Sequence, residues 1–177
     1  MRIDSDLVAG GLRGRREEAR LGKIKLVAVP LAAILFQVYV PLLVIYLGYL
    51  ELPLLVVLFF ALTRRRLTAS LLYGAAVGLL QDALSHNPIG MFGIAKTLVG
   101  YFAAAASFRF DVENPLVRFL LGFFFYFFHQ FLYWVLTQAL LAQPASFSLQ
   151  QALVLGLLNG AVAVPLLEVL AKLLGRG

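Results

Sequence analysis

A stretch of 49 residues without Asp, Glu, Lys or Arg, between Arg118 and Glu168, limits what this chain can fold into. As a single helix it would extend about 74 Å at about 1.5 Å per residue, whereas the hydrocarbon core of a bilayer is about 30 Å thick. A soluble domain of 177 residues leaves too much of its surface in water to hide so much apolar sequence. The stretch therefore predicts two membrane crossings, with a break at the polar, proline-containing segment 143–150.

The positive charges predict how the chain is oriented. Apolar runs predict six spans, at about positions 24–43, 52–66, 67–82, 89–107, 116–141 and 150–172. With these spans, fourteen of the fifteen Lys and Arg residues fall on one side of the membrane. Loops on the cytoplasmic side are enriched in Lys and Arg, so that side is the cytoplasm. We expect an all-α membrane protein with six transmembrane helices and both termini in the cytoplasm.

The first 23 residues are polar and basic, and the apolar run that follows, 26–50, is longer than the core of a signal peptide, which has about 7–15 residues. We expect residues 1–23 to form a basic cytoplasmic arm and residues 24–177 to form one polytopic membrane domain. The arm either lies against anionic lipid or is a tail whose charges only set topology. The chain has no cysteine and only two distant histidines, so neither a disulfide nor a metal or other cofactor is expected.

A cluster of polar and helix-breaking residues, QDALSHNPIG at 81–90, separates two apolar runs. In a continuous helix Asp82 and His86 would share a face, which would suit a proton-transfer pair. Pro88 opposes this arrangement because it disfavours a helical conformation at the preceding residue, so the helix should end near Ser85 or His86. Gly90 would then permit a close approach of the backbone. We favour a structural turn over a catalytic site, and we expect the turn to face protein rather than lipid.

Lys96 is the one positive charge that does not fit the topology. It lies six residues past Gly90, about 9 Å along the fourth span, where an unpaired charge is costly. Asp82 is the nearest acidic partner in sequence, whereas Glu51 and Glu168 could reach it only through the fold. We hypothesise that Asp82 and Lys96 form the ion pair that fixes the hairpin. The residues assigned to a structural role or a possible pocket are Gln81, Asp82, Ser85, His86, Pro88, Gly90, Lys96 and Asn159.

Two further patterns concern helix surfaces. Small residues at four-residue spacing predict close packing, either within the chain or with a partner helix; they are Gly74, Gly78, Gly100, Gly156 and Gly160. The fifth span is aromatic on all sides and suits either lipid or another chain. The candidates for a partner face are Phe124, Phe128, Phe131 and Trp134. His129, in the middle of this span, is predicted to be a neutral, hydrogen-bonded histidine that faces the bundle.

Several of these residues resemble a known family. Gly-Leu-Leu-Gln-Asp at 78–82, followed by Ser85, Pro88 and Gly90 and then by Lys-Thr-Leu-Val-Gly-Tyr at 96–101, is similar to the best-marked stretch of the MreD family of bacterial rod-shape proteins. The likeness extends over about positions 26–174. Glu-Leu-Pro at 51–53, the three arginines at 64–66, and Asn159 and Pro165 add to it, while the charged arm and the run of phenylalanines depart from it.

The resemblance implies a non-enzymatic subunit of the bacterial elongation complex (elongasome) in the inner, cytoplasmic membrane. Its expected partners are a bitopic MreC-like protein and the lipid bilayer, and indirectly MreB, RodA and its transpeptidase; no nucleic-acid partner is expected. The resemblance also implies the six-helix architecture of the substrate-binding subunits of energy-coupling-factor (ECF) transporters, with a possible outward-facing pocket under the 81–90 turn. Two alternatives stay open: a subunit of that transporter type that binds a small molecule or lipid, and an intramembrane enzyme that uses Asp82 and His86.

Overall fold

The structure is a computed structural model that describes residues 21–22, 24–85, 88–141 and 146–174, and this part of the chain contains helices and no strand. A first helix covers residues 24–39. The elements that follow it are the 3₁₀ helices η1 (Val40–Leu42) and η2 (Ile45–Tyr49) and the α-helices α2 (Leu52–Arg64), α3 (Leu67–Leu84), α4 (Met91–Ala106), α5 (Pro115–Leu141) and α6 (Leu149–Leu174). The predicted basic arm lies outside the described residues, apart from positions 21 and 22.

Five segments of the described chain are long and apolar enough to cross a membrane: Ile24–Leu42, Ile45–Arg64, Leu67–Leu84, Pro115–Leu141 and Leu149–Leu174. Helix α4 is also apolar but has only 16 residues, which corresponds to about 24 Å. These lengths and compositions are those of a multi-pass helical membrane protein. Helix α4 is shorter than an ordinary membrane span. It packs along α3 more extensively than any other two helices of the described chain pack together.

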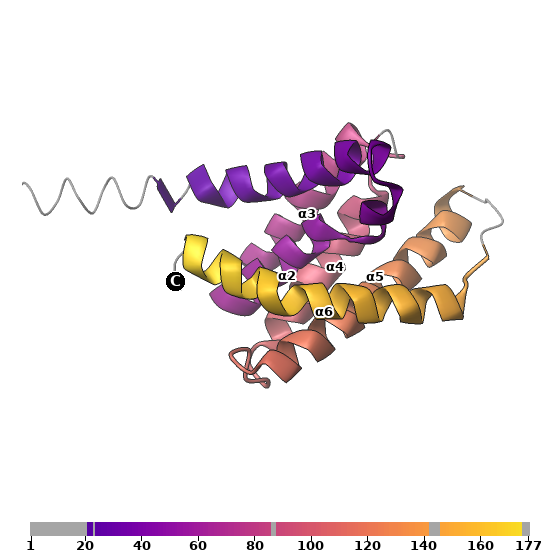
Figure 1. The fold of residues 1–177 in the computed structure, drawn as a ribbon. Helices are drawn as coiled ribbons and strands as arrows, with labels where there is room; N and C mark the ends of the chain where they lie inside the picture. The colour runs from indigo at the N-terminus through magenta and orange to yellow at the C-terminus, as the bar shows by residue number, and fades with distance from the viewer. Residues whose placement is uncertain (1–20, 23, 86–87, 142–145, 175–177) are drawn as a thin grey trace, which may run out of the picture.

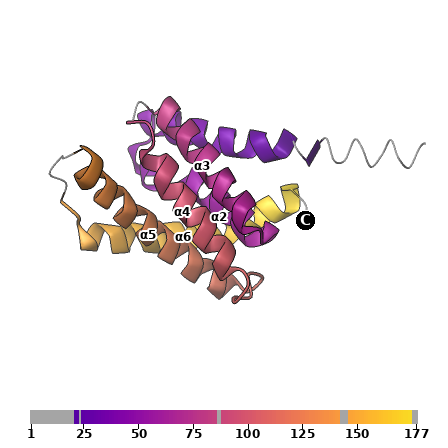
Figure 2. The ribbon, with the colours of Figure 1, turned by 180° about the vertical axis from the view of Figure 1, so that it is seen from behind.

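Helix α2 lies at the centre of the bundle (Figures 1 and 2). Nine of its thirteen residues are buried, although the helix is short, because it contacts α3, α4, α5 and α6. The first helix covers another side, where Ile34 packs against Val57 of α2 and Val77 of α3. Helices α5 and α6 form the second large pair in the bundle. A helix that is apolar on all sides is expected in such a core position.

The two ends of the described chain lie side by side (Figure 1). The Nζ atom of Lys25, at the start of the first helix, donates a hydrogen bond to the carbonyl of Leu173 at the end of α6, over 2.8 Å. On the exposed surface of α6, Lys172 pairs with Glu168 over 2.9 Å, as the i, i+4 spacing predicts. The first helix and α6 therefore reach the same side of the molecule.

Two helix boundaries have unusual backbone conformations. Helix α2 ends at Arg65, which adopts a left-handed conformation with φ 51°, where glycine is the usual residue and another residue costs about 1–2 kcal/mol. Helix α3 ends at Leu84, with Ser85 as its C-cap, which confirms the end that Pro88 predicts. Gly90 precedes α4 with φ 105°. The predicted close backbone approach at Gly90 is wrong, because a Cβ there would meet nothing within 4 Å; the position requires glycine for its positive φ.

Glycines line the contact between α3 and α4. A Cβ atom added to Gly74 or Gly78 would collide with a backbone carbonyl of α4, and one added to Gly100 would collide with the carbonyl of Ser70 in α3. The contact between α5 and α6 is close at Gly160, where a Cβ would lie 2.9 Å from the carbonyl oxygen of Phe119, and less strict at Gly156, where it would lie 3.0 Å from the ring of Phe123, a side chain that can move. These glycine faces are occupied by helices of the same chain, and the backbones of α3 and α4 approach closely only because both lack side chains there.

We predict that Gly78→Ala destabilises the protein more than Gly156→Ala does. The methyl group at position 78 must displace the backbone of α4, and overpacking of this kind costs about 1–3 kcal/mol, whereas at position 156 the Phe123 ring can rotate. Thermal unfolding of the purified variants in detergent measures the difference. Equal losses for the two variants would contradict the backbone contact described between α3 and α4.

Candidate functional site

The carboxylate of Asp82 holds the first turn of α4. Asp82 is fully buried at the end of α3, and its Oδ2 atom accepts hydrogen bonds from the backbone N–H groups of Gly90 at 2.9 Å and Gly93 at 3.1 Å. Its Oδ1 atom accepts a third bond from the N–H of Phe92 at 3.0 Å. The N–H groups at the start of a helix have no partner within the helix, and the helix dipole favours an anion there. Asp82 therefore caps α4 from the preceding helix.

The rest of the predicted polar turn gives α3 a defined end. The hydroxyl of Ser85 donates a hydrogen bond to the carbonyl of Gln81, one turn earlier. Gln81 is buried, and its Oε1 atom has no hydrogen-bond partner among the described residues. Pro88 is exposed at the turn. His86, the suggested proton-transfer partner of Asp82, lies outside the described residues.

The ion pair of Lys96 is formed with Glu51, which corrects the hypothesis that Asp82 is its partner. Lys96 is completely buried, and its Nζ atom lies 3.6 Å from Oε2 of Glu51. The carboxylate of Asp82 instead accepts hydrogen bonds from three backbone N–H groups, which compensate its charge as well as an ammonium group would. The fold brings Glu51 to Lys96 because α2 packs against α4.

An aromatic residue and a histidine complete the surroundings of Lys96. Its Nζ atom lies 3.2 Å from Nε2 of His129 in α5 and 4.3 Å from the centre of the Phe92 ring. An ammonium group can only donate, so His129 would accept this bond at Nε2. The Nδ1 atom of His129 is buried and has no hydrogen-bond partner among the described residues. His129 is fully buried and stacks on Phe92, with ring centres 5.7 Å apart. The cluster around Lys96 thus joins α2, α4 and α5 inside the bundle.

Two amide side chains hold the backbone around Glu51. Asn159 of α6 is fully buried; its Oδ1 accepts a hydrogen bond from the N–H of Glu51 at 2.9 Å, and its Nδ2 donates to the carbonyl of Tyr49 at 3.0 Å. Gln37 of the first helix donates to the carbonyl of Gly48 and accepts from the N–H of Leu52, each over 3.3 Å. These bonds fix the segment between η2 and α2 and so position the Glu51 carboxylate.

The predicted partner face lies on the outside of α5. Phe124 and Phe131 are exposed, at 55% and 42% of their full surface, and Phe128 between them is half-buried. The rings contact each other and α4: Phe124 stacks on Phe128 with centres 6.2 Å apart, and Phe102 of α4 meets Phe128 edge-on at 5.6 Å. The ring centres of Trp134 and Phe131 lie 5.9 Å apart. We call this surface of Phe102, Phe124, Phe128, Phe131 and Trp134 the aromatic face.

An apolar groove continues the aromatic face. It encloses about 440 Å³ between the end of α4 and the first half of α5, and it reaches from Ala106 and Phe110 to Phe124. A different pocket, of about 300 Å³, lies between α5 and α6 near Tyr133, Gln130 and Gln151. This second pocket is not lined by the 81–90 turn, where the resemblance implied one. Within the described part of the chain, no three His, Asp or Glu side chains come together as a metal site would require.

We predict that Lys96→Met destabilises the protein strongly and that Glu51→Gln in the same chain restores part of the loss. Removing one partner of a buried pair costs about 3–5 kcal/mol because the other charge stays buried without compensation, whereas two neutral side chains leave no such charge. Unfolding of the single and double variants in detergent measures the coupling. Lys172→Met, at the exposed pair with Glu168, is the control and should change stability little. If the losses of stability in the two single variants simply add in the double variant, this would contradict a direct interaction between Lys96 and Glu51.

The comparison with known protein families matches residues 20–176 to the family described as rod shape-determining protein MreD. No curated protein and no solved structure matches the chain. The match covers almost the whole sequence and includes both the capped hairpin of α3 and α4 and the Lys96–Glu51 pair. It agrees with the resemblance of the 78–101 stretch and with the multi-pass helical structure. This chain therefore belongs to the MreD family of rod shape-determining membrane proteins.

Proposed function

We propose that this protein is a non-catalytic subunit of the cell-elongation complex in the bacterial inner membrane. In this role it binds the single membrane helix of an MreC-like bitopic protein and so supports lateral peptidoglycan synthesis. Through that partner it is linked to MreB and to RodA and its transpeptidase. The observation that carries this proposal is the aromatic face of α4 and α5 with its adjoining apolar groove.

The aromatic face has the form that a helix-binding surface needs. Phe124, Phe128 and Phe131 follow the i, i+4, i+7 spacing of one helix side, and the groove beside Phe124 provides a concave apolar surface. Lipid tails are as apolar as a leucine side chain, so apolar character alone does not favour a protein partner in the membrane. The shape of the aromatic face does favour a protein partner, because ring–ring contacts hold the phenylalanines in place and a partner helix can pack against them.

Six crossings with both termini in the cytoplasm form part of the same proposal. The contact between Lys25 and Leu173 supports it, since ends on one side require an even number of crossings. Basic residues also lie at that end: Arg65 and Arg118 line one pocket together with Ala171, so the α2–α3 junction and the start of α5 lie next to the end of α6. On the positive-inside rule this end faces the cytoplasm, together with the basic arm 1–23. Helix α4 would then cross within the bundle, with Asp82 and Gly90 near the outer side.

We predict that the double substitution Phe124→Ala and Phe131→Ala abolishes copurification with the MreC-like partner. Both rings are exposed, so their removal takes away contact area for the partner without opening a cavity in the core. Affinity purification from membranes in mild detergent measures the bound partner, and cell shape after replacement of the native gene provides the functional readout, with round cells expected.

The matched control is the double substitution Leu153→Ala and Leu157→Ala on α6, whose side chains are 41% and 52% exposed. This control removes apolar surface from a different helix and should leave both copurification and rod shape unchanged. Equal loss in the two double variants would show that the aromatic face has no special role, and an unchanged complex in the Phe124 and Phe131 variant would rule it out as the docking surface.

A second candidate function, binding of a small molecule as in a transporter subunit of the energy-coupling-factor type, is favoured by the pocket between α5 and α6. Its lining combines aromatic rings with the amides of Gln130 and Gln151, a mixture that suits an amphipathic ligand. If this candidate holds, native mass spectrometry of the purified protein should show a retained molecule that is lost in Gln130→Leu with Gln151→Leu. The single variant Phe124→Ala, whose ring does not line this pocket, should retain it. A spectrum of the bare protein from fresh membranes would remove this candidate.

A further inference from the structure

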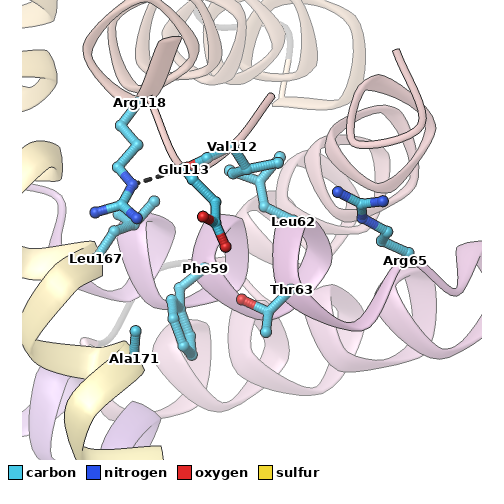
Figure 3. Close-up of a pocket in the computed structure, with 9 residues that line it drawn as sticks. All are labelled: Phe59, Leu62, Thr63, Arg65, Val112, Glu113, Arg118, Leu167 and Ala171. Carbon is cyan, nitrogen blue, oxygen red and sulfur yellow. Dashed lines mark hydrogen bonds between the residues drawn. The ribbon is translucent and has the colours of Figure 1, made fainter. Parts of the chain in front are cut away.

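A cavity of about 360 Å³ lies at the end of the bundle where α2 ends and α5 begins (Figure 3). Its floor is apolar and comes from Phe59 and Leu62 of α2 and Leu167 of α6, all of which are buried. Its rim is charged and comes from Arg65 and Arg118. The cavity therefore combines two guanidinium groups with an apolar floor, and the proposed binding of a membrane partner uses neither.

The two arginines come from different elements and lie on opposite sides of the cavity (Figure 3). Arg118 is half-buried, and its Nε donates a hydrogen bond of 2.8 Å to the carbonyl of Val112. This bond fixes the plane of the guanidinium and leaves its two terminal amino groups as donors at the rim. Arg65 occupies the left-handed backbone position that ends α2, which glycine would adopt at lower cost. A strained arginine that lines a cavity is the kind of outlier that suggests a function.

Glu113 also lines the cavity, and its carboxylate lies between the two arginines (Figure 3). It compensates one of the two positive charges, so the three side chains leave the rim with a net charge of about +1. Glu113 is exposed and lies in the connection that leads into α5, where its N–H donates to Oδ1 of Asp111 over 3.0 Å. An anion that enters the cavity would meet favourable interactions from the arginines and repulsion from Glu113.

We propose that this cavity binds a phosphate group through Arg65 and Arg118. Arginine presents several N–H donors in a fixed plane that matches the oxygens of a phosphate. The apolar floor favours the phosphodiester of an anionic membrane lipid as the source, with the glycerol and first methylene groups against Phe59, Leu62 and Leu167. Basic pockets between membrane helices at the membrane surface suit such headgroups. The inference rests on the proposed orientation in the membrane, but not on the MreC-like partner.

Native mass spectrometry of the full-length protein in detergent, titrated with phosphatidylglycerol, tests the proposal. Arg65→Gln and Arg118→Gln should each weaken lipid binding about fivefold, since a basic residue near the membrane surface contributes that much to anionic-lipid binding. Glu113→Gln should strengthen binding because it removes the repulsive carboxylate. Arg66→Gln is the matched control: it removes the same charge from the same turn, but Arg66 does not line the cavity. Unfolding of each variant without lipid shows that the fold is kept, and Arg118→Lys, which keeps the charge, replaces Arg118→Gln if that variant fails to fold.

A second arm replaces the lipid by inorganic phosphate. A rise in thermal stability with phosphate that is lost in Arg65→Gln, in the absence of added lipid, would support the phosphate site and assign a free phosphate as its source. Equal weakening by Arg65→Gln and Arg66→Gln would overturn the proposal, because it would show a diffuse charge effect. Unchanged binding of phosphatidylglycerol and of inorganic phosphate in all variants would also overturn the proposal. Copurification with the MreC-like partner is measured separately, so a failure of either proposal leaves the other to be judged on its own result.

Discussion

The capping of α4 by Asp82 determines much of how this bundle is assembled. A helix that starts inside a membrane protein has several N–H groups without partners, and lipid offers none. The two carboxylate oxygens of Asp82 accept hydrogen bonds from three such groups, the N–H groups of Gly90, Phe92 and Gly93. The same bonds fix how far α4 is shifted along α3. With this register, Gly74 and Gly78 lie against carbonyl groups of α4, and the two backbones can approach as closely as they do.

The register of α4 also decides where Lys96 points. Its side chain reaches the interior between α2 and α5, where a lone ammonium would be costly, so a carboxylate must be brought to it from elsewhere in the chain. Gln37 and Asn159 do this by holding the segment that carries Glu51, each through hydrogen bonds to its backbone. Polar contacts thus connect the first helix, α2, α4, α5 and α6. In a membrane, where the hydrophobic effect does not draw helices together, such contacts and close packing specify the arrangement.

The sequence was sufficient to predict the parts of this site that depend on local rules. Pro88 predicts where α3 ends, and the cost of burying charge marks Asp82 and Lys96 as residues that need partners. It did not predict the partners themselves. Asp82 and Lys96 are close in sequence and opposite in charge, but backbone N–H groups, which every residue except proline has, compete for a carboxylate and leave no mark in the sequence. Glu51 could be identified only from the packing of α2 on α4, which no local pattern contains.

Different sides of α4 pack in the interior of the bundle and contribute to its surface, so this helix connects the two. One side lacks side chains at Gly93 and Gly100 and packs on α3, while Phe102 on another side joins the rings of α5 in the aromatic face. The position of Phe102 therefore depends on the register that Asp82 sets and on the ion pair of Lys96, six residues earlier along α4. The exposed rings of Phe124 and Phe131, by contrast, contribute little to the core. In the proposed complex, a partner helix would contact the exposed rings of Phe124 and Phe131 on a framework whose geometry the buried charges hold in place.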